Sequence, residues 1–178
     1  MGLPEPISPA HVEKLQLPAR IILPGLEQLV GSFALAPASP WRDGPESLLE
    51  LLNSQVRVLP ILRESDEAVL LVSRLAIDWV EVGSHVDAEL IRPRAYLVTR
   101  EEHVQVRLMN GRLVEGRVTM ELPEHLNRIS DFLNLPDDFF PLTTRSCIML
   151  FNKSRIAGAR LFHASPRPLR EIEEPELG

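Results

Sequence analysis

Five histidines are the residues of this chain with the clearest capacity for metal binding or acid–base chemistry (His11, His85, His103, His125 and His163). None of them forms the H-x-H or H-x₃-H spacing that would bring two imidazoles to one metal ion. Glu101, Glu102 and His103 stand together before an expected strand, where a solvated turn is the simpler interpretation. The sequence also lacks the G-x-S-x-G, P-loop and G-x-G-x-x-G motifs. We therefore expect no catalytic residue, no metal site, no cofactor and no enzymatic activity.

Two other candidates have structural interpretations. Asp137 and Asp138 could bind a cation, but Pro136 before them and Phe139 after them predict a turn that leads into a buried strand. Cys147 is the single cysteine, so an intrachain disulfide is excluded. Its position in the apolar run CIML predicts a buried, inert thiol.

The best nucleic-acid candidates are Lys153 and Arg155, near Phe151, together with Arg74. The chain carries a net charge of −6, whereas binding along a phosphate backbone requires a basic stripe. Nucleic acid is thus an unlikely partner. Of the two tryptophans, Trp79 follows an apolar strand and is expected in the core. Trp41 lies in the loop ASPWRDGP and is the better candidate for an interface anchor.

The elements that carry these residues follow one pattern that occurs twice in the chain. LVGSFAL and VEGRVTM recur roughly 80 residues apart, and so do ESLLELLN and RISDFLN, VLPI and FFPLT, and AVLLVSRLAI and CIMLFNKSRI. The shared positions are Gly31/Gly116, Asn53/Asn134, Pro60/Pro141 and Ile77/Ile156. A repeated unit must bury the same face each time, so the repeat predicts the architecture before any single residue does.

Each unit is predicted to begin with a hairpin. Asn110-Gly111 predicts a type I′ turn, and Pro24-Gly25 takes the same place in the first unit. Gly31 and Gly116 fall among inward-facing residues, where a missing side chain permits strong bending or close approach of another backbone. Matching glycines at one pleat position indicate strongly curved sheets.

A short helix and two strands complete each unit. Asp43 with Glu46 resembles a capping box, Pro45 suits a first helical turn, and Pro123 can start the second helix. Strands are expected over 56–62 and 68–82, and over 138–143 and 147–162. The pattern is strand–strand–helix–strand–strand, twice. We expect a mostly β fold with short helices (α+β) in which two units pack as a pseudo-dimer around one shared core.

These patterns divide the chain into five parts. We expect an extended, proline-rich arm over 1–19, a first unit over 20–82, and a connector over 83–102 with an added strand at 95–99. The second unit covers 103–163, and an acidic, proline-containing tail covers 164–178.

The second unit resembles a known family. VRLMNGRLVEGRVTMEL, a helix, FFPLT and IMLFNKSRI are similar to the small bacterial Sm-like (LSm-type) β-barrel domains of unknown function, and residues 20–82 give a weaker echo. The resemblance implies a tandem of barrels with a tendency to assemble edge to edge. RNA-binding members carry Asp and Asn after the second strand and Arg-Gly in the last hairpin. This chain has a helix and Asn152-Lys153-Ser154-Arg155 at those places instead.

Two functions remain as hypotheses. The first is a non-catalytic accessory or scaffolding subunit that stabilises a larger protein assembly. It would bind other subunits through residues 1–18 and 165–178, and Trp41 is a further candidate contact. The second is an Sm-like RNA-binding or regulatory protein. The sequence has neither a signal-peptide pattern nor a transmembrane segment, so we expect a cytoplasmic protein. Attachment to the inner membrane through an energy-converting membrane complex is a candidate setting.

Overall fold

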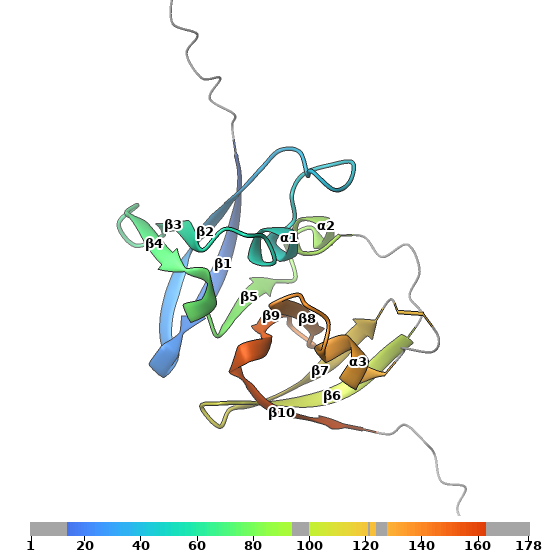
Figure 1. The fold of residues 1–178 in the computed structure, drawn as a ribbon. Helices are drawn as coiled ribbons and strands as arrows, with labels where there is room; N and C mark the ends of the chain where they lie inside the picture. Colours follow the sequence, from blue (N-terminus) through green and yellow to red (C-terminus); the bar gives the residue numbers. More distant parts are fainter. Residues whose placement is uncertain (1–13, 94–99, 121, 124–127, 163–178) are drawn as a thin grey trace, which may run out of the picture.

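The computed structural model describes residues 14–93, 100–120, 122–123 and 128–162, and the fold is built from these (Figure 1). The strands are β1 (Leu15–Leu23), β2 (Glu27–Leu35), β3 (Val58–Arg63), β4 (Val69–Ser73), β5 (Trp79–Gly83), β6 (Arg100–Leu108), β7 (Leu113–Met120), β8 (Phe139–Thr143), β9 (Cys147–Asn152) and β10 (Ile156–Leu161). The helices are α1 (Leu48–Leu52), α2 (Ala88–Ile91) and α3 (Ile129–Leu133), with short 3₁₀ turns η1 (Pro24–Leu26), η2 (Arg74–Ala76) and η4 (Lys153–Arg155).

All ten described strands form one antiparallel sheet in the order β10-β6-β7-β8-β9-β5-β1-β2-β3-β4. The N-terminal unit (β1 to β5) contributes the order β5-β1-β2-β3-β4, and the C-terminal unit (β6 to β10) contributes β10-β6-β7-β8-β9. Strand order is therefore the same in both units. The fold is mostly β with short helices, as the sequence predicted. In Figure 1 the first unit lies above the second, with β5 and β9 between them.

Each unit has five strands where the sequence pattern predicted four. The expected strand over 68–82 breaks at η2 into β4 and β5, and the one over 147–162 breaks at η4 into β9 and β10. The pattern missed the break because both halves are apolar, and apolar periodicity does not register a three-residue turn between them. The break has a large consequence. It sends β4 to the edge of the sheet, while β5 pairs with both β1 and β9.

Gly31 and Gly116 occupy places where another strand comes very close. A Cβ built on Gly31 would lie 2.5 Å from the carbonyl oxygen of Leu62 on β3. A Cβ on Gly116 would lie 2.7 Å from the carbonyl oxygen of Thr143 on β8. The expectation of close backbone approach is thus confirmed at both positions, and the reason is steric.

The β6–β7 turn differs from the predicted type I′ turn. Gly111 has φ +85°, but Asn110 is not among the positive-φ residues of the described chain. The Gly111 N–H donates to the Leu108 carbonyl, and the Leu108 N–H donates to the Arg112 carbonyl. This is a three-residue loop that ends in a left-handed glycine. Asn110 contributes through its side chain, whose Oδ1 accepts from the Arg112 N–H at 3.0 Å.

The helix starts were predicted wrongly. Helix α1 begins after Ser47, whose side chain and that of Glu50 form the capping box, instead of at Asp43 and Glu46. The Glu46 carboxylate accepts from the Ala36 N–H, which closes the preceding loop. Helix α3 follows Arg128, later than a start at Pro123. Capping depends on which of several polar residues reaches the free N–H groups, and the loop path decides that.

The predicted boundaries also shift. Strand β1 starts at Leu15, inside the segment predicted as an arm, and Leu17 is buried. Pro18 is tolerated because β1 pairs with β5 only from Arg20 to Ile22, so at Pro18 one side has no described neighbour. Strand β6 starts at Arg100, within the predicted connector, which also holds α2. The strand predicted at 95–99 lies outside the described residues.

The interior forms two apolar clusters instead of the single core that was expected. The first is built mainly by the N-terminal unit but includes Phe139 and Leu150 from the C-terminal unit. The second is built mainly by the C-terminal unit but includes Ile22 and Trp79 from the N-terminal unit. Trp79 is fully buried, as predicted. Each unit therefore completes the other's core. No helix in the described part of the chain is long and apolar enough to cross a membrane.

We expect Gly116→Ala to destabilise the protein by about 1–3 kcal/mol, because the new methyl group overlaps the Thr143 carbonyl and the β7–β8 contact must open. The midpoint of urea unfolding measures this loss. Gly158→Ala is the control, since nothing lies within 4 Å of a Cβ built there. An equal loss in both variants would contradict the steric explanation.

Candidate functional site at the junction of the two units

The junction is built around the pairing of β5 with β9. Five residue pairs, from Trp79↔Phe151 to Gly83↔Cys147, join the last strand of the first unit to the fourth strand of the second. Phe139 on β8 and Leu150 on β9 project into the first unit's cluster. Strands β8 and β9 are consequently covered on both faces at these positions, and only a covered face can hold buried polar groups in fixed positions.

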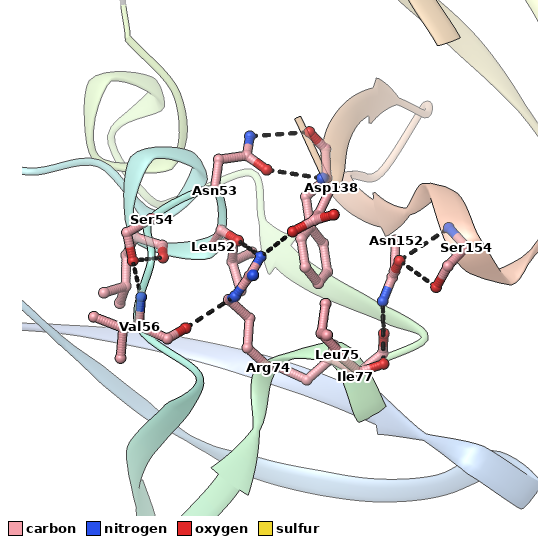
Figure 2. Close-up of polar contacts among 12 residues, drawn as sticks. Leu52, Asn53, Ser54, Val56, Arg74, Leu75, Ile77, Asp138, Asn152 and Ser154 are labelled. Atoms are coloured by element: carbon pink, nitrogen blue, oxygen red, sulfur yellow. Dashed lines mark hydrogen bonds and ion pairs between the residues drawn. The ribbon is translucent and has the colours of Figure 1, made fainter. Parts of the chain in front are cut away.

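Arg74 binds the two units to each other at one end of this pairing (Figure 2). The η2 turn places its side chain in the interior, where it is 9% exposed. One Nη1 donates to the Leu52 carbonyl at 2.7 Å and to the Asp138 carboxylate at 2.6 Å. Its Nε donates to the Val56 carbonyl at 2.9 Å. The guanidinium thus has all of these acceptors within the protein itself, and Asp138 supplies the opposite charge from the other unit.

Asn53 forms a second connection at the C-terminal end of α1. Its Nδ2 donates to the Phe139 carbonyl at 3.0 Å, and its Oδ1 accepts from the Phe139 N–H at 2.8 Å. The side chain thus pairs with the backbone of β8 as a neighbouring strand would. The sequence marked Asn53 only as a helix end.

Asn152 forms the corresponding connection from the C-terminal unit. Its Nδ2 donates to the Ile77 carbonyl at 3.0 Å and to the Leu75 carbonyl at 3.3 Å. Its Oδ1 accepts from the N–H and the hydroxyl of Ser154. Figure 2 shows Asn152 reaching from the second unit toward Ile77, opposite Arg74. Asn152 is 1% exposed, and its bond to the Ile77 carbonyl is fully buried.

Asp78 and Arg155 form an ion pair across the junction. The Arg155 Nε lies 3.2 Å from an Asp78 carboxylate oxygen, without the alignment of a hydrogen bond. Burial raises the pKa of Asp78, and the charge of Arg155 opposes this only in part. A hollow of about 230 Å³ lies beside the pair and is lined by the turns at Gly25 and Asn110. The Asp78 side chain is 10% exposed and that of Arg155 is 35% exposed, so only the carboxylate is largely covered.

Lys153 is directed inward in the same way. Its ammonium group donates to the Leu135 carbonyl at 3.0 Å and to the Phe132 carbonyl at 3.3 Å. Burial lowers its pKa, against the opposing charges of Asp137 and Asp138. All three cations that the sequence singled out for nucleic acid (Arg74, Lys153 and Arg155) therefore have partners inside the protein, and the tip is not a free basic surface.

A different surface surrounds Trp41, whose side chain is 83% exposed. The loop that carries it is closed by a bond from the Ser39 N–H to the Gly44 carbonyl and by one from the Glu46 N–H to the Ala36 carbonyl. Trp41 lines a groove of about 550 Å³, together with Leu49 and Asn53. The groove also contains Asp137, so it extends from the loop to the junction.

Glu50 fixes this loop to α1. Its carboxylate accepts from the Ser47 N–H at 2.7 Å, from the Ser39 hydroxyl at 2.8 Å and from Arg42 at 3.4 Å. Burial alone would raise the pKa of Glu50, but the bonds from Ser47 and Ser39, with the charge of Arg42, outweigh it and lower the pKa. The ionised carboxylate is therefore part of the folded loop.

The remaining sequence candidates lie apart. Glu101 faces Thr119 and Arg117, and Glu102 pairs with Arg100. His103 stacks 4.7 Å from Phe162. In the described ranges no three acidic, histidine or cysteine side chains gather as metal ligands. His11, His125 and His163 lie outside those ranges. Cys147 is half-buried, less than expected, and lies 3.4 Å from the Thr144 hydroxyl.

We expect Asn53→Ala to destabilise the protein by about 1–3 kcal/mol, because the Phe139 N–H and carbonyl lose both partners at a covered site. Asn134→Ala is the matched control, since Asn134 ends α3 at the equivalent place but its side chain is exposed. Thermal unfolding of both variants measures the difference. Equal losses would show that helix capping, and not the junction, is the source.

The lowered pKa of Glu50 predicts a pH dependence. The ionised form stabilises the fold above the ordinary pKa of 4.5, and this contribution is lost as pH falls through the lower folded value. We expect Glu50→Gln to be less stable than the parent at pH 7 and to approach it toward pH 3. Urea unfolding at both pH values measures the gap. Asp78 has the opposite sign but is common to both proteins, so a gap that does not narrow would contradict the assignment.

In comparisons with known proteins, no family model, no curated protein and no solved structure matches the chain. The function must be inferred from the residues of the junction and of the groove. Their arrangement is a polar clasp that joins two units, next to a groove that carries one exposed tryptophan.

Proposed function

We propose that this protein is a non-catalytic accessory subunit that stabilises a larger protein assembly, with Trp41 as an anchor for its partner. The observation that carries the proposal is a tryptophan 83% exposed on a loop that its own hydrogen bonds hold in place. Tryptophan is enriched among the residues that dominate binding energy at interfaces. A loop that is already ordered loses little entropy when it binds, which favours affinity.

The groove beside Trp41 fits a polypeptide better than a small metabolite. It is open, and its lining combines apolar residues such as Pro40 and Leu49 with the acids Glu46 and Asp137. A partner segment with an apolar side chain next to a basic one would match this lining. The clasp of Arg74, Asn53 and Asn152 supports the proposal as well, because its hydrogen bonds join the two units to each other.

We further propose that the two units are related Sm-like barrels packed as a pseudo-dimer. Their identical strand order and the close strand approach at Gly31 and Gly116 support this relation. The segments 1–13 and 165–178 serve in the proposal as arms that extend the contact with other subunits, and their proline-rich or acidic composition suits extended binding. Attachment to a membrane complex through such a partner remains part of the proposal.

The N-terminal arm must be shorter than the sequence suggested. Residues up to 18 include the first part of β1, and Leu17 is 1% exposed. Deleting residues 1–18 would therefore remove part of the core and confuse loss of folding with loss of binding. A deletion of residues 1–13 leaves the described strand intact.

The alternative, an Sm-like protein that binds RNA, has less support. Lys153 and Arg74 donate to carbonyl groups inside the protein, and Arg155 faces Asp78. Binding RNA through them would require breaking those contacts first, and the net charge of −6 opposes approach to phosphate.

We expect Trp41→Ala to weaken the association with the partner by about 30-fold and to leave the unfolding temperature unchanged. The full chain is captured from its native cell extract, the co-purified protein is identified by mass spectrometry, and its affinity is then measured with purified components. Met109→Ala is the matched control, because Met109 is 70% exposed on a different surface. Single-stranded RNA at low salt is tested in parallel. A partner bound equally by both variants, or tight RNA binding without a protein partner, would overturn the proposal.

A further inference from the structure

The outer edge of the N-terminal unit exposes an apolar surface. The equivalent surface of the C-terminal unit is covered. We define the edge patch as Val58 and Pro60 on β3 with Val69 and Leu71 on β4. Val58, Val69 and Leu71 are 47%, 62% and 75% exposed. Strand β4 ends the sheet on this side, so its outer backbone groups have no described strand beside them. An apolar edge strand of this kind is a template for pairing with another chain.

The repeat identifies what covers the equivalent surface inside the chain. Because η2 and η4 hold the same place in the two units, β4 corresponds to β9 and β3 to β8. Val58 then corresponds to Phe139, which is 1% exposed, and Leu71 corresponds to Leu150, which is fully buried. Both of these lie in the cluster of the neighbouring unit. The edge patch is thus the same surface without its neighbour.

The opposite edge of the sheet supplies that neighbour. Strand β9 pairs with β5, and β5 corresponds to β10, which forms the other end of the sheet. Strand β10 is exposed from Ala157 to Leu161. The sheet of each chain therefore ends in β4 on one side and in β10 on the other, and these are the two halves of a junction. The complete junction, β9 with β5, lies in the middle of the sheet.

We propose that the β4 edge of one chain binds the β10 edge of a second copy, in the register in which β9 binds β5. The known pair Val80↔Leu150 becomes Ala159↔Leu71 between chains, and Val82↔Ile148 becomes Leu161↔Val69. Such a contact is head to tail, so it produces closed rings or filaments of this protein. The interaction needs no foreign partner and is independent of Trp41.

The polar groups make this contact weaker than the internal one. At the proposed contact between chains, Lys153 takes the place of Arg74 and Arg57 takes the place of Asp138. These two cations repel each other. Ala157 takes the place of Asp78 and Ala76 takes the place of Arg155, so the contact between chains lacks this second ion pair. Asn134, in turn, corresponds to Asn53 and would meet the backbone of Val58. The result is an association that depends on concentration and that salt strengthens, since salt screens the repulsion.

Sedimentation of the purified full chain over a range of concentrations tests the proposal. We expect the mass to rise with concentration for the parent protein and to stay at one chain for Leu71→Glu and for Ala159→Glu. Both positions are exposed, so the variants should fold, and Met109→Glu is the control for an added charge elsewhere. Mixing Leu71→Glu with Ala159→Glu should restore dimers and nothing larger, because one intact β4 edge then meets one intact β10 edge.

Charge reversal gives a test that a general loss of solubility cannot imitate. Arg57→Asp provides Lys153 with an acidic partner, as Asp138 does for Arg74, and we expect self-association at least about two-fold tighter. Added salt should then weaken the association of this variant, although it strengthens that of the parent. Trp41→Ala should change neither the strength of self-association nor its dependence on salt.

Several outcomes would overturn the inference. One is a parent protein that stays monomeric at every concentration tested. Another is an association unaffected by Leu71→Glu and Ala159→Glu, or one that their mixture does not restore. A chain that associates only after residues 1–13 and 165–178 are deleted would show instead that its own ends cover the edge patch. Loss of Trp41-dependent partner binding alone would leave the inference standing.

Discussion

The pairing of β5 with β9 is the interaction on which the rest of the structure depends. It joins two five-stranded units into one sheet and brings Phe139 and Leu150 into the first core. Burial of those side chains favours the contact through the hydrophobic effect, which has no direction of its own. Direction comes from the polar groups around it, since Arg74 reaches Asp138 and Asn53 reaches the backbone of Phe139 only when the two units lie in this register. Apolar area holds the junction, and the buried hydrogen bonds select its geometry.

The same junction explains why Arg74 and Lys153 are poor candidates for ligand binding. A guanidinium or ammonium group in a partly buried site needs acceptors, and Arg74 and Lys153 take theirs from backbone carbonyls at the ends of helices. The junction leaves other surfaces of the protein open. These are the groove beside Trp41 and the two ends of the sheet, where β4 and β10 have no further neighbour among the described strands.

Much of the fold could be predicted from the sequence, for identifiable reasons. The glycines at 31 and 116 mark close strand approach because only glycine fits there, and the apolar character around Trp79 predicts its burial. The break at η2, by contrast, was missed, because a short turn between two apolar strands leaves no gap in the pattern. The junction residues were missed for a related cause. Asn53 and Asn152 look like ordinary turn residues until the other unit stands beside them.

The sequence by itself determined the mostly β fold with two similar units, the glycine positions at which another strand comes close, and the exposed tryptophan in a proline-rich loop. Those features are local, since they depend on alternation, on backbone sterics and on turn chemistry within a few residues. Only the tertiary structure decided that the units share one sheet, that their cores exchange residues and that the basic turns face inward. These are contacts between residues far apart in the chain, and they depend on which strand edges meet. The edges of different strands are chemically similar, so which two edges pair is known only from the folded structure.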